Sequence, residues 1–490
     1  MSVLGIDIGN SGCRVAVFDE RLSQLAAATR TYRAAADADD EVRAEEIRDV
    51  VFDGIREVNR QCAHDPVTAL AVSAMGETAV GIDGGGRPVT ALRMSHHRQG
   101  ESRLAEIAAR VGPERIRSST GQPVHAMFTL SHLAWAPAER PEWRKARLIL
   151  DIGGYLLHAL GGPAVFDYTL AARTLAFDTE HRRWDAELLD AAGCSGDRLP
   201  PALAVGTAIG EVAPDLATSL GFRGRPTLVT GGHDQACAFW GAGADGGGQP
   251  VLSLGTTECL TTGHAGRPGT LIEANYAAYP VDDGDQWLSL AGTQAGGSAM
   301  PWLADLVRRP LAELLDRLAP TPAQVLCLPH LLGSGSLEND PDSRGAFTGL
   351  SLATTPADLL LALLEASGFE TAKALAVLRS VGPVADAVRM VGGGIRHARA
   401  VSARADAAGV TMIPVPGHSA ARGAAILAGV GAGRWSRESA TAAVRTGPPV
   451  PPDPAHADWY RRRRAQQARL YPLLSDINSP AVTSPETITA

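Results

Sequence analysis

The sequence predicts an α/β protein of two domains built on the same plan, and two observations carry this prediction. The chain has 490 residues, more than one hydrophobic core usually serves. Residues 6–14 and 252–259 form two glycine-rich turns, each between two apolar, strand-like runs. Glycine allows positive φ and close approach, so such a turn presents backbone N–H groups and short polar side chains to an anion. One turn in each half predicts a duplicated fold that holds a polyphosphate from both sides.

The first half of the chain begins with strands. Five apolar runs predict strands, at residues 3–8, 14–19, 25–32, 68–73 and 227–230. Apolar residues recur at helical spacing over residues 47–58, which predicts an amphipathic helix. Residues 101–192 have a mostly helical pattern. The last strand runs directly into the segment Gly-Gly-His-Asp-Gln at 231–235.

The second half repeats this arrangement. Strands are predicted at residues 251–254, 259–262, 287–290, 387–391 and 410–413, and helices at 356–378 and 419–428. A glycine-rich stretch at 241–249 favours a hinge. We therefore expect a first domain over residues 1–244 and a second over 245–435. A linker, a C-terminal helix at 456–474 and a disordered tail are expected within 436–490.

The composition is that of a soluble globular enzyme, with 45% apolar and 20% charged residues. The net charge of −8 argues against a nucleic-acid or anionic-membrane partner, and the basic run Arg461-Arg462-Arg463-Arg464 favours a solvated helix face. No apolar run approaches the roughly 18 residues that span a bilayer, and the N-terminus lacks the features of a signal peptide. The six cysteines are scattered without a C-x-x-C pair, which favours reduced thiols in the cytoplasm over a zinc site.

The chain has no P-loop, because no G-x-x-x-x-G-K-[ST] segment occurs. Lysine is almost absent, with Lys145 and Lys373 the only two. Any binding of phosphate must therefore come from backbone N–H groups, short polar side chains, arginine or a metal.

Two carboxylates stand where a strand ends beside a glycine. Asp7 ends the first strand, and it either holds a hydrated Mg²⁺ or accepts hydrogen bonds from the turn amides. Asp234 follows the strand at 227–230. It is either the N-cap of the next helix or a general base that accepts the proton of an attacking hydroxyl, a recurring part of phosphoryl transfer. The residues alone leave both alternatives open.

Three further groups of residues also have two interpretations each. The segments Gly-Gly-Gly at 392–394 and Gly-Ala-Ala at 423–425 either let a nucleotide lie against the backbone or permit tight packing. Glu77 and Arg98 flank a hairpin predicted at 84–86, and they either hydrogen-bond a polyol or lie at the surface. The pair His96-His97 lacks a partner at metal-ligand spacing, which disfavours a metal site there.

The order of these segments resembles that of the FGGY family of carbohydrate kinases, over residues 5–433. The matching segments are GIDIG at 5–9, MGE at 75–77, GGHDQ at 231–235, SLGTT at 253–257, RGAFTGL at 344–350, GGG at 392–394 with AD at 405–406, and GAA at 423–425. Together they are highly specific, although no single one is. The resemblance implies two actin-like (ribonuclease H-like) ATPase domains, each a mixed five-stranded sheet with helices, with a cleft between them.

The resemblance also implies roles for particular residues. Asp234 would be the catalytic base and Asp7 the carboxylate associated with Mg²⁺. The residues implied to hold ATP are Asn10, Ser11, Arg14, Gly255, Thr256, Thr257, Gly392, Gly393, Gly394, His397 and Ala424. The residues implied to hold the sugar are Met75, Gly76, Glu77, Arg98 and Asp234.

The chain departs from the family pattern in places that bear on specificity. The usual W-x-D-x-R segment is Met-Ser-His-His-Arg at 94–98, which keeps only the arginine and leaves the sugar unnamed. Asn10 and His397 stand where threonine and asparagine are usual, so the nucleotide preference is also open.

We therefore expect an ATP- and Mg²⁺-dependent kinase that phosphorylates a hydroxyl of a ketose, polyol or related sugar. One alternative is a degenerate, non-catalytic nucleotide-binding sensor or scaffold, which the altered segment 94–98 and His397 motivate. An actin- or chaperone-like ATPase with a protein partner is disfavoured by Glu77 and the segment 231–235. Dimers are frequent among similar kinases, so a homodimer is a further expectation.

Overall fold

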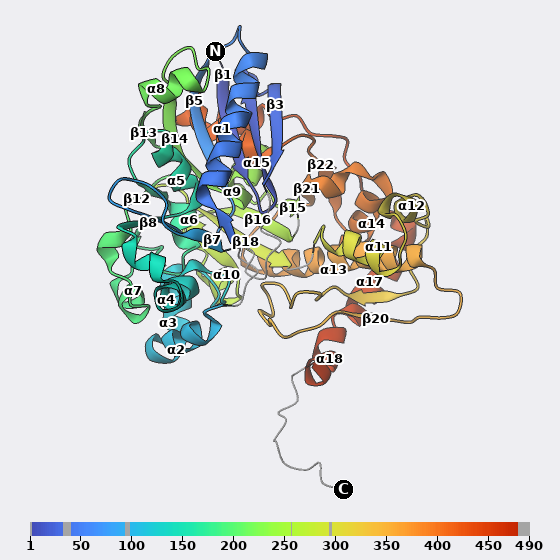
Figure 1. Ribbon diagram of the computed structural model, residues 1–490. Coiled ribbons are helices and arrows are strands. Elements are labelled where there is room, and N and C mark those ends of the chain that lie inside the picture. The colour runs from blue at the N-terminus through green and yellow to red at the C-terminus, as the bar shows by residue number, and fades with distance from the viewer. Residues whose placement is uncertain (1, 33–40, 94–98, 256, 294–295, 479–490) are drawn as a thin grey trace.

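Two mixed sheets of six strands form the framework of the structure, a computed structural model that describes residues 2–32, 41–93, 99–255, 257–293 and 296–478 (Figure 1). The first sheet has the spatial order β13 (Ala208–Glu211), β14 (Thr227–His233), β5 (Val67–Ala74), β1 (Ser2–Ile8), β2 (Gly12–Phe18) and β3 (Gln24–Thr31). The second has the order β17 (Ala277–Pro280), β18 (Gln286–Thr293), β16 (Glu258–Ala265), β15 (Val251–Leu254), β21 (Ala387–Gly392) and β22 (Thr411–Pro414).

Five strands of each sheet follow the same plan. The first sheet contains the order β3-β2-β1-β5-β14, and the second contains β18-β16-β15-β21-β22. In both, the strand before the glycine-rich turn is antiparallel to the next strand and parallel to a later one. The predicted duplicated α/β plan is therefore confirmed.

Each sheet has one strand more than the five predicted, and the additional strand lies at an edge. Strand β13 is mostly exposed, so its sequence lacks the apolar pattern that marks a buried strand. Strand β17 is buried but only four residues long and ends in Pro280, a residue that sheets accept mainly at their edges.

The helices surround the two sheets. Those that precede the second sheet are α1 (Ala44–Gln61), α2 (Glu101–Val111), α3 (Pro113–Thr120), α4 (Thr129–Glu139), α5 (Ile152–Ala159), α6 (Tyr168–Ala172), α7 (Ala186–Ala191), α8 (Pro214–Ser219) and α9 (Asp234–Gly241). The later ones are α10 (Gly269–Glu273), α11 (Ala299–Leu306), α12 (Leu311–Asp316), α13 (Pro356–Val381), α14 (Ala398–Ala408), α15 (Ser419–Gly431), α16 (Arg437–Ala442), α17 (Ala457–Gln467) and α18 (Leu470–Asn478). The longest of them, α13, packs along α14 beside the second sheet (Figure 1).

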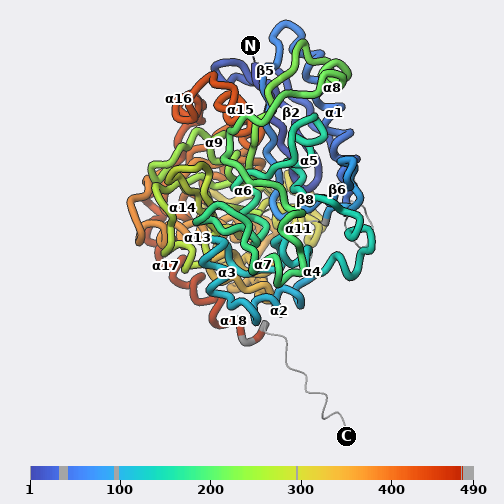
Figure 2. Tube along the Cα trace, turned by 90° about the vertical axis from the view of Figure 1, so that its left-hand side faces the viewer, coloured from blue at the N-terminus to red at the C-terminus, as the bar shows by residue number. Residues whose placement is uncertain are grey.

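Helix α15 returns from the second sheet to the first. It follows β22, yet it packs on β1, β5 and β14 and lies against α9 (Figure 2). The two helices touch through their backbones, because a Cβ on Gly423 would lie 1.8 Å from the carbonyl oxygen of Cys237. Of the two alternatives for residues 423–425, the structure therefore supports tight packing of helices. The division at 244/245 and 435/436 stays a prediction, since this helix joins the two halves.

The single helix predicted over 456–474 is replaced by two, α17 and α18, and α16 lies in the stretch expected to be a linker. Two arginines of the basic run are only partly exposed. Arg464 Nη1 donates to the carbonyl oxygens of Ala407 and Ala408, at 3.2 and 2.7 Å, and so satisfies the C-terminal end of α14. Arg463 Nη2 donates to Gln324 O at 2.7 Å. The basic run therefore attaches α17 to its neighbours in addition to facing solvent, and the predicted tail at 479–490 lies outside the described residues.

All six cysteines are free thiols, and only Cys62 is not fully buried. Within the described ranges, no helix combines the length and the apolar character needed to cross a bilayer.

Candidate active site

Asp7 and Asp234 lie where the parallel strands β1 and β14 of the first sheet end. In the strand register, Asp7 of β1 pairs with Ser73 of β5, and Ser73 pairs with Gly232 of β14. Asp234 follows β14 directly and is the first residue of α9. Parallel pairing of three neighbouring strands thus brings together two carboxylates that are far apart along the chain.

The Asp7 carboxylate accepts a hydrogen bond from Ser73 Oγ, at 3.2 Å. The carboxylate makes no other hydrogen bond to the residues that the structure describes. The alternative in which amides of the turn satisfy it is therefore wrong. Burial raises the pKa of Asp7 to about 6, against the opposing effects of the Arg14 charge and of the Ser73 hydroxyl. Because the side chain is still partly exposed, a cation that keeps most of its water could reach it.

Asp234 is not the N-cap of α9. His233 occupies that position, and no side chain caps this end of the helix. The Asp234 side chain is 29% exposed, while its Oδ1 is buried and makes no hydrogen bond within the described part of the chain. Burial, together with the negative charges of Asp7 and Glu77, raises the pKa of Asp234 to about 7, against the lowering effect of hydrogen bonds from Gln235. An ionisable carboxylate with a free oxygen and a pKa near 7 is suited to accept a proton.

Glu77 lies in the interior, so the alternative of a surface residue is wrong. Its side chain is 6% exposed and forms an ion pair with Arg173, whose Nε donates to Glu77 Oε1 at 2.6 Å. Arg173 Nη1 in turn donates to Gln122 Oε1 at 2.9 Å. Glu77 also has a φ of +61°, and backbone strain of this kind tends to occur at functional sites.

The His233 ring lies between the segment 75–77 and Asp234. A Cβ on Gly76 would lie 3.1 Å from the His233 ring, and His233 Nε2 lies 3.2 Å from Asp234 Oδ1. The structure therefore brings Met75, Gly76 and Glu77 next to the candidate base. Arg98, together with the rest of 94–98, lies outside the described residues.

Each of the two glycine-rich turns joins a pair of antiparallel strands, β1 to β2 and β15 to β16, with four residues between the last paired positions in the first turn and three in the second. Gly9 N donates to Gly12 O at 3.0 Å, and Gly255 N donates to Thr257 O at 3.1 Å. The residues at their tips are exposed: Asn10, Ser11, Gly255 and Thr257. Thr256 lies outside the described residues. Both turns thus present polar groups that an anion could contact.

Positive charge gathers near the first turn. Burial lowers the pKa of His418, and the charges of Arg14, Arg422 and Arg396 lower it further. These arginines come from β2, from α15 and from the short helical turn Gly393–Arg396. Arg14 Nε is buried and makes no hydrogen bond to the residues that are described. This group of charges favours an anion.

The glycine run lies beside the second turn. Gly392 of β21 pairs with Leu254 of β15, the residue before the turn. Gly392 and Gly393 are exposed, and a Cβ on Gly393 would meet no atom within 4 Å. Gly394 packs on the Leu254 side chain. The glycine run and the second turn therefore form one continuous surface.

The other two residues expected to hold adenosine differ from each other in exposure. His397 is partly exposed, and its Nδ1 has no hydrogen bond to described residues. Ala424 is 0% exposed within α15, so its methyl group packs in the core and the structure does not bring it to this surface.

Glu258 directly follows the second turn and anchors it to the interior. This residue begins β16, is almost fully buried, and lies 3.0 Å from Arg404 Nη2 of α14. Ser367 of α13 donates to its other oxygen and accepts from Arg404 Nε at 3.0 Å. A buried, fully bonded ion pair fixes the strand end from which the turn projects.

Sequence reasoning missed several residues of this site. Four of them lie in segments without a motif and enter the site only through the fold: Gln122, Arg173, Ser367 and Tyr279, whose hydroxyl lies 3.1 Å from His233 Nδ1. Three others lie in or beside a recognised motif, and that position was the signal that could have found them: His233 lies within 231–235, Glu258 follows 253–257, and Arg404 precedes 405–406.

Comparison with known families gives two matches that together span most of the chain. The N-terminal domain of the FGGY family of carbohydrate kinases matches residues 2–241, and its C-terminal domain matches residues 251–432. The chain is 27% identical over 404 residues to a xylulose kinase of Escherichia coli (strain K12), covering 80% of this chain and 82% of that protein. It is 24% identical over 381 residues to a gluconokinase of Bacillus subtilis (strain 168), covering 74% of each.

The fold is also that of a solved kinase structure. The crystal structure of a xylulose kinase from Brucella ovis superposes with a TM-score of 0.88 at 25% identity, covering 97% of this chain and all of that one.

Proposed function

Because the chain belongs to the FGGY family of carbohydrate kinases and is an ATP-dependent carbohydrate kinase, we propose that it phosphorylates a hydroxyl of a ketose, polyol or related sugar with Asp234 as general base. The proposal depends chiefly on the Asp234 carboxylate. One of its oxygens is buried without a hydrogen bond to described residues, and burial raises its pKa to about 7. The ionised carboxylate would take the proton of the acceptor hydroxyl as the terminal phosphoryl group departs from ADP.

The acceptor would lie between Asp234 and the segment 75–77. Both contacts of Arg173 with Glu77 use Oε1, which supports a role for the other oxygen in binding a sugar hydroxyl. Gly76 allows this segment to approach the His233 ring. A buried, bonded carboxylate holds a hydroxyl with more geometric precision than a mobile surface side chain.

The phosphates would lie between the two turns. Exposed groups of Asn10, Ser11, Gly255 and Thr257 would donate to phosphate oxygens, and the charge of Arg14 would attract them. Adenosine would lie on the surface formed by Gly392, Gly393 and His397. Closure of the two halves would then exclude water and limit hydrolysis of ATP.

Asp7 fits a Mg²⁺ ion, because it is a partly exposed carboxylate beside another carboxylate. When bound there, the ion would supply positive charge to the phosphates. The hydrogen bond from Ser73 Oγ, at 3.2 Å, would restrain the Asp7 carboxylate. The cytoplasmic location and the homodimer stay predictions.

The decisive experiment is a coupled assay of ADP release with Mg·ATP over pentuloses, hexuloses, alditols and sugar acids. We expect one substrate class to raise ADP release at least 100-fold above the rate without sugar. Calorimetry with ATP accompanies the assay. Nucleotide binding without turnover of any sugar would contradict the proposal and favour the non-catalytic sensor.

A further inference from the structure

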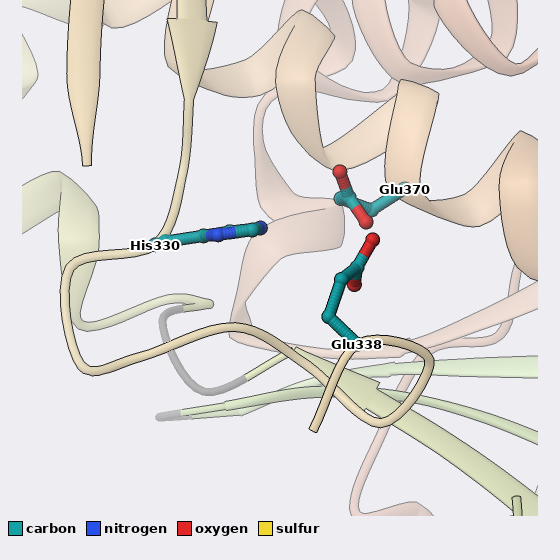
Figure 3. Close-up of side chains that lie close together, drawn as sticks. All are labelled: His330, Glu338 and Glu370. Atoms are coloured by element: carbon teal, nitrogen blue, oxygen red, sulfur yellow. The ribbon is translucent and has the colours of Figure 1, made fainter. Parts of the chain in front are cut away.

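A buried group of two carboxylates and one imidazole lies apart from the residues assigned above. His330 follows β19 (Leu326–Leu328), Glu338 lies in the loop that comes after it, and Glu370 lies on α13. One potential ligand atom of each lies within 4.8 Å of the others. Figure 3 shows the imidazole ring pointing toward the two carboxylates. We name this group the His330 cluster.

Two atoms of the His330 cluster are buried and lack hydrogen bonds. His330 is 3% exposed, and its Nδ1 lies 2.7 Å from Ser343 Oγ. Its Nε2, and Oε2 of Glu338, make no hydrogen bond to any residue in the described ranges. Burial of polar atoms without partners costs free energy. A ligand bound to both atoms would remove that cost.

The charge of the cluster also favours an additional cation. Lys373 Nζ bonds to Glu338 Oε1 and lies 3.5 Å from Glu370 Oε2. Gln467 Nε2 donates to Glu370 Oε1 at 2.9 Å. One ammonium therefore faces two carboxylates, and negative charge remains in excess. The contacts of Lys373 are to Glu338 Oε1 and Glu370, so they leave Glu338 Oε2 free.

Space for water adjoins the cluster. A cavity of about 30 Å³ is lined in part by Glu338, Glu370, Ser336 and Thr371. This volume admits one or two water molecules. A cation held by three side chains could complete its coordination with water from this cavity.

We propose that His330 Nε2, Glu338 and Glu370 bind a divalent cation of the zinc class. An imidazole nitrogen with two carboxylates suits Zn²⁺, whereas Mg²⁺ prefers oxygen ligands alone. Ser343 bonds to His330, Gln467 bonds to Glu370, and Lys373 contacts both carboxylates, and such partners are common around metal sites. The Nδ1–H tautomer of His330 would donate to Ser343 Oγ and leave Nε2 free for the metal.

The cation would fasten the C-terminal helices to α13. Gln467 ends α17, and Tyr471 of α18 donates to Asp340 Oδ2 at 3.0 Å. The Tyr471 ring lies 5.7 Å from the His330 ring. One helical turn before Glu370, Ser367 bonds to Glu258 beneath the second turn. The site is therefore structural, and it does not depend on the proposed function.

The test is equilibrium dialysis of the purified full chain, stripped of metal, against Zn²⁺. We expect one ion per chain with micromolar or tighter affinity. His330→Gln and Glu338→Gln should each weaken binding by at least about 10-fold. His181→Gln is the matched control, because His181 forms an exposed pair with Asp178 at 2.8 Å outside the cluster, and it should bind as the wild type does. Zn²⁺ at 100 times its Kd should raise Tm by about 5 °C in the wild type and less in the two cluster variants.

A second variant keeps the test decisive if His330→Gln folds poorly. Lys373→Met removes the ammonium that repels the cation, and we expect it to bind Zn²⁺ about 10-fold more tightly than the wild type. A Co²⁺ complex of either protein should absorb visible light with nitrogen and oxygen ligation, and Glu338→Gln should change that spectrum. Absence of stoichiometric Zn²⁺ from both the wild type and Lys373→Met would overturn the proposal. Binding that is unchanged in both His330→Gln and Glu338→Gln would overturn it as well.

Discussion

His233 Nε2 lies 3.2 Å from Asp234 Oδ1, and the hydroxyl of Tyr279 lies 3.1 Å from the other ring nitrogen. Burial holds the pKa of His233 well below its usual value, so the ring is neutral and only one nitrogen carries a proton. If Tyr279 donates to Nδ1, the proton is on Nε2 and faces Asp234. A small rotation would complete a hydrogen bond to the carboxylate, and this arrangement would orient Asp234 as a base.

The first prediction concerns Asp234→Asn. The amide cannot accept the hydroxyl proton, so kcat should fall by at least about 1,000-fold. The Kd for Mg·ATP, measured by calorimetry, should stay within about threefold of wild type, because the phosphates contact other residues. The fold should persist, since the substitution removes a charge that burial disfavours. Asp386→Asn, at a fully exposed carboxylate, is the control. A kcat within about tenfold of wild type, roughly 1.4 kcal/mol of barrier, would show that Asp234 is not the base.

The second prediction concerns pH. The base must be ionised, and burial raises its pKa to about 7, so kcat/KM should rise with pH up to about 7 and level off above it. His233→Gln removes the Nε2–H group that favours the ionised form, so the inflection should move to higher pH by about half a unit to one unit. The ionisation of ATP is common to both proteins and cancels in the comparison. Identical inflections in the two profiles would contradict the role given to His233.

The third prediction compares two glycines. A Cβ on Gly423 would overlap the carbonyl of Cys237, so Gly423→Ala should lower the free energy of unfolding by about 3 kcal/mol. A Cβ on Gly393 would meet open space, so Gly393→Ala should change stability by less than about 1 kcal/mol while weakening Mg·ATP binding. Urea unfolding and calorimetry measure the two effects. If Gly393→Ala binds Mg·ATP as the wild type does, the nucleotide does not lie on the glycine run.

The parts of the fold that could be predicted from the sequence are those with local signals. Strands β1 and β5 are buried on both faces and are apolar over most of their length, and Leu228-Val229 gives β14 a shorter apolar signal. The turns carry glycine and small polar residues. The edge strand β13 has no such signal, since three of its four residues are exposed. Local pattern therefore gave five strands in each sheet and missed the sixth.

The site could be predicted only where it coincides with a motif. Asp7, Asp234 and Glu77 follow strands or glycines, and those positions suggested them. Arg173 follows the short helix α6 in a segment without a recognisable pattern, and the fold alone pairs it with Glu77, 96 positions away along the chain. The capping assignment also could not be decided locally, because one residue separates an N-cap from the first helical position. His233 took the cap, which leaves the Asp234 carboxylate available.

The fourth prediction tests the ion pair beneath the second turn. Arg404→Met leaves the buried Glu258 carboxylate without its partner, and this should lower the free energy of unfolding by about 3–5 kcal/mol. The Kd for Mg·ATP should rise as well, because the strand end that carries Gly255 and Thr257 loses its anchor. Adding Glu258→Gln to Arg404→Met removes the unpaired charge and should recover part of the stability, which a double-mutant cycle by urea unfolding measures. Arg461→Met is the matched control, because Arg461 forms a solvent-exposed ion pair with Asp458 and such pairs contribute little to stability. If the two single substitutions at 258 and 404 add without coupling, the pair does not hold the turn.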